Sequence, residues 1–143
     1  MQSCKLLLSG VIALSLAVQL QAEPLEVKGD ATIIPAGAKL ETLWEEGGFT
    51  EGVAAAADGT MYFSDFAQPF DARPARVMKF DPATSKTSIH CADSKMANGL
   101  MFTRDGRLIA CTASPLGGQR ALVEIKPDGS LSPIVERYEG KRF

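Results

Sequence analysis

Glu51 and Asn98 are the side chains whose type and spacing could do chemistry in this sequence. Each is followed directly by glycine, and the two stand 47 positions apart. Carboxylate and amide oxygens are hard donors that bind divalent cations, and an amide can also bind substrate hydroxyl groups. Because a cation needs oxygens from several segments, donors at corresponding positions support each other. The simpler alternatives are a solvated loop carboxylate for Glu51 and a turn-forming residue for Asn98.

The other reactive side chains are expected to have structural roles. Asp65 ends a predicted strand, and we expect it to order a loop or to be solvated. His90 is the only histidine, so this chain alone cannot supply a reaction that needs two histidines. The position of His90 on a predicted outer strand predicts a surface side chain. Cys91 and Cys111 are expected to be free, half-buried thiols, because nothing in the sequence brings their Cβ atoms together.

The spacing of 47 residues recurs along the chain and predicts the elements that position Glu51 and Asn98. Asp58-Gly59 is repeated as Asp105-Gly106, and the apolar segment after the first pair falls on the segment after the second. A period in the forties with several β-rich segments per unit is typical of a propeller blade. The sequence therefore predicts an all-β fold of four-stranded antiparallel sheets, with about two and a half blades of a β-propeller present.

In a ring of blades the innermost strands converge around one mouth of the central channel, where Glu51 and Asn98 would lie. An additional segment, Leu40–Trp44, alternates apolar and polar residues and is expected to be a strand that awaits a partner. The strands expected within the two blades are 52–57, 61–65, 76–80, 87–91, 100–103, 107–113, 121–126 and 131–136.

Composition and the N-terminal segment bound the class of protein. The chain has 143 residues, 45% apolar content and a net charge of −2, which indicates a globular protein without a basic surface for nucleic acid.

The apolar run Leu6–Leu20 is shorter than the roughly 20 residues that a membrane-spanning helix needs. It predicts a signal peptide at 1–22, cleaved near Ala22, and a secreted or periplasmic protein that has no membrane contact after cleavage. The alternative is an uncleaved N-terminal anchor.

The expected organisation is therefore a signal peptide at 1–22, a lead-in segment at 23–38 and a partial propeller domain at 39–143. Propellers close with four to eight blades, so about two and a half blades cannot form a ring. We expect the sequence to be the N-terminal part of a longer protein. The alternative is a short protein that assembles from several copies.

Several of these motifs, in their order and spacing, resemble the regucalcin and gluconolactonase family of six-bladed propellers. The resemblance covers Lys39 to Phe143, nearly all of the predicted mature chain. One departure is Val53, where members of the family often have proline. The motifs that carry the resemblance are Phe49-Thr50-Glu51-Gly52, Asp58 to Asp65, Phe80 to Thr84, Ala97-Asn98-Gly99-Leu100, Arg104 to Leu108 and Tyr138 to Phe143.

The resemblance implies a fold, an activity and a cofactor. Family members bind a divalent cation in the central channel and hydrolyse sugar lactones or related esters. Glu51 matches a metal ligand of the family, and Asn98 matches a channel-facing position, which makes it a candidate for substrate binding or a second metal contact. The identity of the cation (Ca²⁺, Zn²⁺, Mg²⁺ or Mn²⁺) is left open, and the remaining ligands and the catalytic base are expected beyond Phe143.

The sequence thus leads to two functional hypotheses. The first is an exported, metal-dependent hydrolase of sugar lactones or related esters, whose substrate is a small molecule and whose present portion is inactive alone. The second is a non-catalytic propeller that binds a ligand or a protein partner at its channel mouth. The fold does not separate the two, because propellers support both classes of function.

Overall fold

The computed structural model describes residues 29–113 and 118–143, so the predicted signal peptide at 1–22 lies outside the described residues. The chain divides into two compact units, Met1–Glu41 and Thr42–Phe143. In the described part of the first unit, the Asp30 carboxylate accepts hydrogen bonds from the Thr32 backbone N–H and hydroxyl, at 2.8 and 2.7 Å. Across the described ranges we find no helix with the length and apolar character to cross a membrane.

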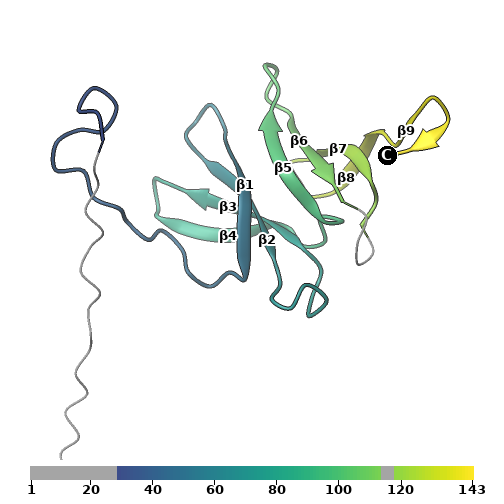
Figure 1. Ribbon diagram of the computed structural model, residues 1–143, viewed down its shortest axis with the longest axis horizontal. Coiled ribbons are helices and arrows are strands. Elements are labelled where there is room, and N and C mark those ends of the chain that lie inside the picture. Colours follow the sequence, from purple (N-terminus) through teal and green to yellow (C-terminus); the bar gives the residue numbers. More distant parts are fainter. Residues whose placement is uncertain (1–28, 114–117) are drawn as a thin grey trace, which may run out of the picture. The chain divides into compact units, whose positions relative to one another are not determined.

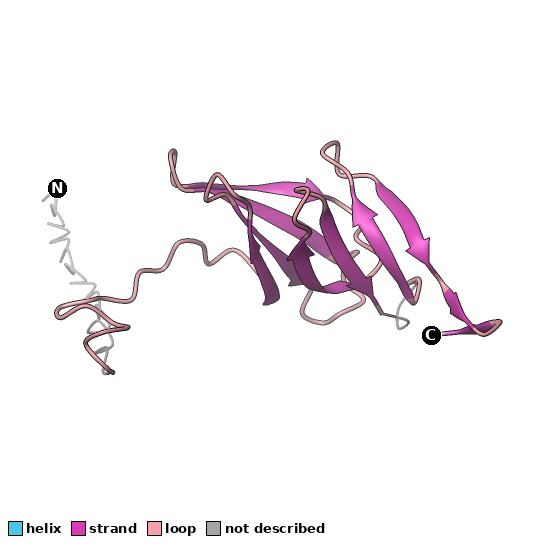
Figure 2. Ribbon diagram, turned by 90° about the horizontal axis from the view of Figure 1, so that it is seen from above, coloured by secondary structure: helices cyan, strands magenta, loops and turns pink. Residues whose placement is uncertain are grey.

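The second unit consists of strands and loops, and no helix occurs in the described residues (Figure 2). Two four-stranded antiparallel sheets have the strand orders β1-β2-β3-β4 and β5-β6-β7-β8, and a small hairpin pairs β9 with β10 (Figure 1). The prediction of an all-β fold with four-stranded antiparallel sheets is confirmed. The strands are β1 (Phe49–Ala55), β2 (Met61–Phe66), β3 (Arg76–Asp81), β4 (Lys86–Cys91), β5 (Ala97–Phe102), β6 (Leu108–Thr112), β7 (Ala121–Ile125), β8 (Leu131–Val135), β9 (Arg137–Tyr138) and β10 (Lys141–Arg142).

The two sheets repeat each other in their turns as well as in their strand order. Gly59 and Gly106 end the equivalent hairpins with φ of +86° and +83°, a left-handed conformation that glycine adopts without steric cost. The N–H of each glycine donates at 3.0 Å to the carbonyl oxygen three residues earlier. A β-bulge interrupts β1 after Glu51, and a matching bulge interrupts β5 after Ala97. The repeat read from the sequence is therefore also a repeat of backbone geometry.

The hydrophobic core of the second unit is shared between the two sheets. Strand β1 packs against β5, and side chains from both sheets join one cluster of buried apolar residues. Neither sheet could bury its inner face alone, which is the packing rule of a propeller. The members of this cluster are Val77, Cys91, Ala97, Leu108, Ala110, Ala121, Val123 and Ile125.

Some boundaries differ from the sequence prediction. Residues 40–44 do not form a strand, and Leu40 and Leu43 are 63% and 50% exposed. A strand is held by hydrogen bonds to a neighbour, and no described strand pairs with this segment. The inner strands also begin three residues earlier than predicted, at Phe49 and Ala97, because the bulge lets the chain continue in the sheet through a glycine.

The prediction that Cys91 and Cys111 are both half-buried is wrong, although both are free thiols. Cys91 is 3% exposed because its side chain joins the core cluster between the sheets. Cys111 is exposed, because successive residues of β6 point to opposite faces and its neighbours on either side are buried. Burial raises the pKa of the Cys91 thiol, which makes it less reactive.

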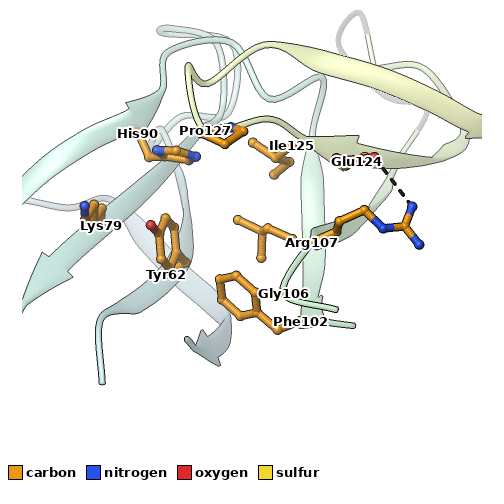
Figure 3. Close-up of a pocket in the computed structure, with 10 residues that line it drawn as sticks. Tyr62, Lys79, His90, Phe102, Gly106, Arg107, Glu124, Ile125 and Pro127 are labelled. Atoms are coloured by element: carbon orange, nitrogen blue, oxygen red, sulfur yellow. Dashed lines mark ion pairs between the residues drawn. The ribbon is translucent and has the colours of Figure 1, made fainter. Parts of the chain in front are cut away.

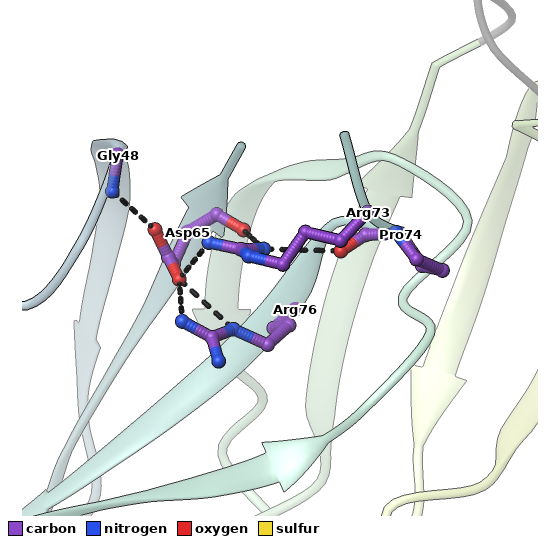
Figure 4. A network of polar contacts seen from close by, with 5 residues as sticks. All are labelled: Gly48, Asp65, Arg73, Pro74 and Arg76. Atoms are coloured by element: carbon purple, nitrogen blue, oxygen red, sulfur yellow. Dashed lines mark hydrogen bonds and ion pairs between the residues drawn. The ribbon is translucent and has the colours of Figure 1, made fainter. Parts of the chain in front are cut away.

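The buried carboxylate of Asp65 ties together the start of β1, the end of β2 and the start of β3 (Figure 4). It is fully buried and accepts hydrogen bonds from the Gly48 N–H at 3.1 Å, from Arg73 at 2.6 Å and from Arg76 at 3.0 and 2.5 Å. Arg73 also donates to the Pro74 carbonyl oxygen at 3.0 Å. Burial of a charge is tolerated when it is paired and fully hydrogen-bonded, as here. Asp65 therefore orders the adjacent loop, one of the roles predicted from the sequence.

Asp65→Asn is expected to lower the free energy of unfolding by about 3–5 kcal/mol, because two partly buried guanidinium groups would lose their counter-charge. Urea unfolding followed by circular dichroism measures the change. The matched control is Asp105→Asn, whose ion pair with Arg107 is exposed on both sides and should leave the urea midpoint almost unchanged. Equal midpoint shifts for the two variants would contradict the role assigned to Asp65.

Candidate functional site

The structure brings Glu51 and Asn98 into direct contact. The amide Nδ2 of Asn98 donates a hydrogen bond of 2.5 Å to the Glu51 carboxylate oxygen Oε1. Glu51 lies in β1 and Asn98 in β5, the first strand of each sheet, and these two strands pack against each other (Figure 1). Both residues lie within strands at the bulges, whereas the sequence analysis placed them just ahead of the strands. Glu51 and Asn98, which occupy corresponding positions of the repeat, are thus neighbours in the folded protein.

Gly52 allows the two strands to approach this closely. Its φ is +64°, and a Cβ atom at this position would lie 1.8 Å from the carbonyl oxygen of Asn98, far inside van der Waals contact. A glycine within a strand often marks such a bulge or close backbone approach. The equivalent residue in the second sheet, Gly99, has no atom within 4 Å of its hypothetical Cβ. Of these two corresponding glycines, only Gly52 is therefore required by sterics.

A hydrogen bond from Ser64 fixes the backbone of Asn98 against the first sheet. The hydroxyl of Ser64 in β2 donates to the Asn98 carbonyl oxygen at 2.8 Å, and Ser64 is fully buried. Ser64 is also paired in register with Glu51 across β1 and β2. The sequence gives no signal for this role, because a serine within a strand does not reveal its partner in another sheet.

An apolar cavity of about 220 Å³ opens beside the Glu51–Asn98 pair. Three phenylalanines form one wall: the ring centroids of Phe49 and Phe66 lie 6.2 Å apart, those of Phe49 and Phe70 6.3 Å, and those of Phe66 and Phe70 6.1 Å. Met96 and Ala113 add to the apolar lining, and Glu51 and Asn98 are the polar members among the described residues. The sequence analysis did not assign these residues to the site.

Glu51 and Asn98 fit a divalent cation in kind, since both offer hard oxygen donors. Within residues 29–113 and 118–143, no group of three or more histidine, cysteine, aspartate or glutamate residues is arranged to hold a metal ion. Calcium takes six to eight oxygen ligands, so this pair could supply only part of a coordination shell. The arrangement suits a site at which further oxygen donors meet the pair.

A second cavity, of about 280 Å³, lies near the Asp105-Gly106 turn (Figure 3). Two of its charged groups, Arg107 and Glu124, lie 3.6 Å apart, and Arg107 also lies 2.9 Å from Asp105 in the adjacent turn. His90 lines this cavity, with its ring 5.0 Å from that of Tyr62 in an edge-on contact. The prediction of a surface His90 is therefore wrong: packing between the sheets half-buries the side chain and lowers its pKa.

Comparisons with known proteins agree with this architecture. No protein-family model matches the chain, and no curated protein sequence matches it. Among solved structures, a gluconolactonase from Xanthomonas campestris, described as important in glucose secondary metabolic pathways, superimposes with a TM-score of 0.66 at 27% identity. The match covers 85% of this chain and 38% of that one. A structural-genomics target provisionally assigned as a gluconolactonase gives a TM-score of 0.62 at 29% identity, over 76% of this chain and 34% of that one.

The fold is thus part of a β-propeller, and the two described sheets are blades of it. Of these two solved structures, one is a gluconolactonase and the other is provisionally assigned as one, which supports the family resemblance read from the motifs. The chain spans well under half the length of either structure.

Gly52→Ala is expected to lower the free energy of unfolding by at least about 2 kcal/mol, because the new Cβ would collide with the Asn98 carbonyl and because alanine is strained at positive φ. The matched control is Gly99→Ala, 47 positions later, which should change stability by less than about 1 kcal/mol. Chemical denaturation of both variants provides the comparison. A Gly52→Ala protein as stable as the Gly99→Ala protein would refute the proposed close approach.

His90 is expected to make the protein less stable as the pH falls below about 6.5. Burial lowers its folded pKa below the ordinary value of 6.5, so the unfolded chain takes up the proton first and is favoured on acidification. This loss begins near pH 6.5 and levels off once the pH is below the folded pKa. Urea midpoints measured from about pH 7.5 to about pH 5.5 should fall less steeply in His90→Gln, and identical slopes would contradict the assignment.

Proposed function

We propose that the propeller containing this chain is an exported, metal-dependent hydrolase of lactones or related esters. The observation that carries the proposal is the contact between the Glu51 carboxylate and the Asn98 amide, supplied by the first strands of two propeller blades. The similarity to gluconolactonases over 85% and 76% of the chain supports the reaction type. A small-molecule lactone or ester is the corresponding substrate, and the apolar run Leu6–Leu20 supports export.

Glu51 and Asn98 are the residues that would hold the cation. Ca²⁺, Mg²⁺, Mn²⁺ and Zn²⁺ all accept oxygen ligands, and two donors do not fix the coordination number that distinguishes them. A bound divalent cation supplies Lewis-acid polarisation of a carbonyl oxygen. Ser64 and Gly52 keep Asn98 and Glu51 in register, since one bonds the Asn98 carbonyl and the other allows the backbones to meet.

The general base must be a residue other than Asp65. Its carboxylate is fully buried and engaged by two guanidinium groups and a backbone N–H, so it is not free to take a proton from water. A base also has to lie within hydrogen-bond reach of the water that it activates. Glu51 is assigned to the metal, and we therefore assign it no role in proton transfer.

The alternative is a non-catalytic propeller that binds a ligand at the same place. The apolar cavity beside Glu51 and Asn98 favours this second function as much as the first, because it offers contact area and few reactive groups. Turnover separates the two functions, since both predict binding and only the hydrolase predicts ring opening.

The test uses the full-length product of the reading frame that encodes this chain. The protein is stripped with a chelator and reloaded separately with Ca²⁺, Mg²⁺, Mn²⁺ or Zn²⁺, and acid release from a panel of lactones is followed in a pH-stat. We expect activity to return with at least one cation. Glu51→Gln should lower kcat/KM by about 100-fold or more and weaken binding of that cation, because a charged ligand is lost.

The matched control is Glu46→Gln, which removes an exposed carboxylate five positions earlier and should leave activity unchanged. Hydrolysis that survives complete removal of metal, or full activity in Glu51→Gln, would refute the metal-dependent hydrolase. Ligand binding without turnover of any lactone would instead support the binding propeller.

A further inference from the structure

We propose that the cavity beside Glu51 and Asn98 takes an apolar alkyl or aryl portion of its ligand, so that the preferred lactones carry a hydrocarbon substituent and few hydroxyl groups. The inference rests on the proposed function for the reaction, and on the cavity itself for the choice of substrate. It selects lipophilic lactones within the proposed class and departs from the sugar lactones that the family resemblance implies.

The chemistry of the lining is the first argument. Five of the seven described residues that line the cavity are apolar: Phe49, Phe66, Phe70, Met96 and Ala113. A sugar lactone carries several hydroxyl groups, and each one buried without a hydrogen-bond partner weakens binding. A hydrocarbon group loses no hydrogen bonds on entering the same space and gains contact with three aromatic rings.

The hydrogen bonds that Glu51 and Asn98 already make are the second argument. Asn98 Nδ2 donates to Glu51 Oε1, and the Asn98 carbonyl accepts from Ser64. With a cation bound, the same side-chain oxygens would serve as its ligands. In the cation-bound state these oxygens would be occupied and would offer little hydrogen bonding to the hydroxyls of a sugar. Recognition by this wall must therefore depend on shape and apolar contact.

Exposure and size are the third argument. Phe49 and Phe70 are 45% and 44% exposed, whereas Phe66 beneath them is 4% exposed. Two aromatic rings therefore stand at the entrance with surface that a ligand could cover. The volume of about 220 Å³ exceeds the roughly 150 Å³ of an apolar protein cavity known to hold benzene. A phenyl ring or a short alkyl chain fits this space.

The cavity is also preorganised on one side. Phe70 lies in the loop between β2 and β3, and that loop is anchored three residues later by the bond of Arg73 to the buried Asp65. Phe49 begins β1 directly after Gly48, whose N–H bonds the same carboxylate. The buried Asp65 carboxylate thus anchors the two segments that carry Phe49 and Phe70. Binding a ligand then costs less conformational entropy, because these segments are already ordered.

The experiment compares lactones that share one six-membered ring. The metal-loaded full-length protein is assayed with glucono-δ-lactone, with unsubstituted δ-valerolactone and with δ-nonalactone, which carries a butyl group beside the ring oxygen. We expect kcat/KM for δ-nonalactone to exceed that for δ-valerolactone at least about tenfold, since even one well-buried methylene is worth tenfold or more. Glucono-δ-lactone should be the poorest of the three.

Variants connect this preference to the wall. Phe70→Asn should reduce the ratio of kcat/KM for δ-nonalactone over δ-valerolactone by about tenfold, and Phe70→Leu should largely retain it, because leucine keeps an apolar surface. Ile89→Asn, at a 51% exposed position on the outer strand β4, should leave the ratio unchanged. An equal loss in Phe70→Asn and Ile89→Asn would overturn the assignment of the wall.

Calorimetric titration with the corresponding lactams, which resist hydrolysis, separates the two proposals. A preference for glucono-δ-lactone and its lactam would overturn the apolar specificity and leave the hydrolase intact. Binding of the butyl lactam without turnover of any lactone would support the apolar cavity and overturn the hydrolase. Failure to bind the butyl lactam more tightly than the unsubstituted lactam overturns the inference regardless of activity.

Discussion

The close approach of β1 to β5 is the constraint on which the candidate site depends. The backbones meet where Gly52 faces the carbonyl of Asn98, with no room for a Cβ atom between them. This distance fixes how tightly the two blades stack, and it brings the Glu51 carboxylate within hydrogen-bond reach of the Asn98 amide. The bond from Ser64 then removes the remaining freedom of the Asn98 backbone. The absence of a side chain at Gly52 thus allows the side chains of Glu51 and Asn98 to meet.

The buried carboxylate of Asp65 also orders segments next to the candidate site. Its hydrogen bonds reach the residue before β1, the loop after β2 and the first residue of β3. A lone buried carboxylate would be strongly unfavourable, but here two guanidinium groups and an N–H satisfy it. Polar groups inside the blade therefore support an aromatic wall at its rim, which an apolar core alone would not orient.

Much of the fold was predictable because its signals are local. Asp-Gly pairs define the hairpins and alternating residues define the strands, so the 47-residue repeat predicts both sheets and the correspondence of Glu51 with Asn98. The strand predicted at Leu40–Trp44 is absent because alternation alone supplies no pairing partner. The link from Ser64 and the convergence of Phe49 and Phe70 could not be predicted, since they depend on contacts between sheets and on a loop with no periodic pattern. That loop contains Pro69, Phe70 and Pro74, and prolines indicate a turn without indicating its contacts.

The position of the site between two sheets also determines when it forms during folding. Each sheet is made of consecutive hairpins, so its strands pair after short loop closures. The bond between Asn98 and Glu51 joins residues 47 positions apart, and the bond from Ser64 to Asn98 joins residues 34 apart. Both bonds form only when β5 docks against β1 and β2. A chain with every strand formed but its blades undocked would have the secondary structure of the native protein and no candidate site.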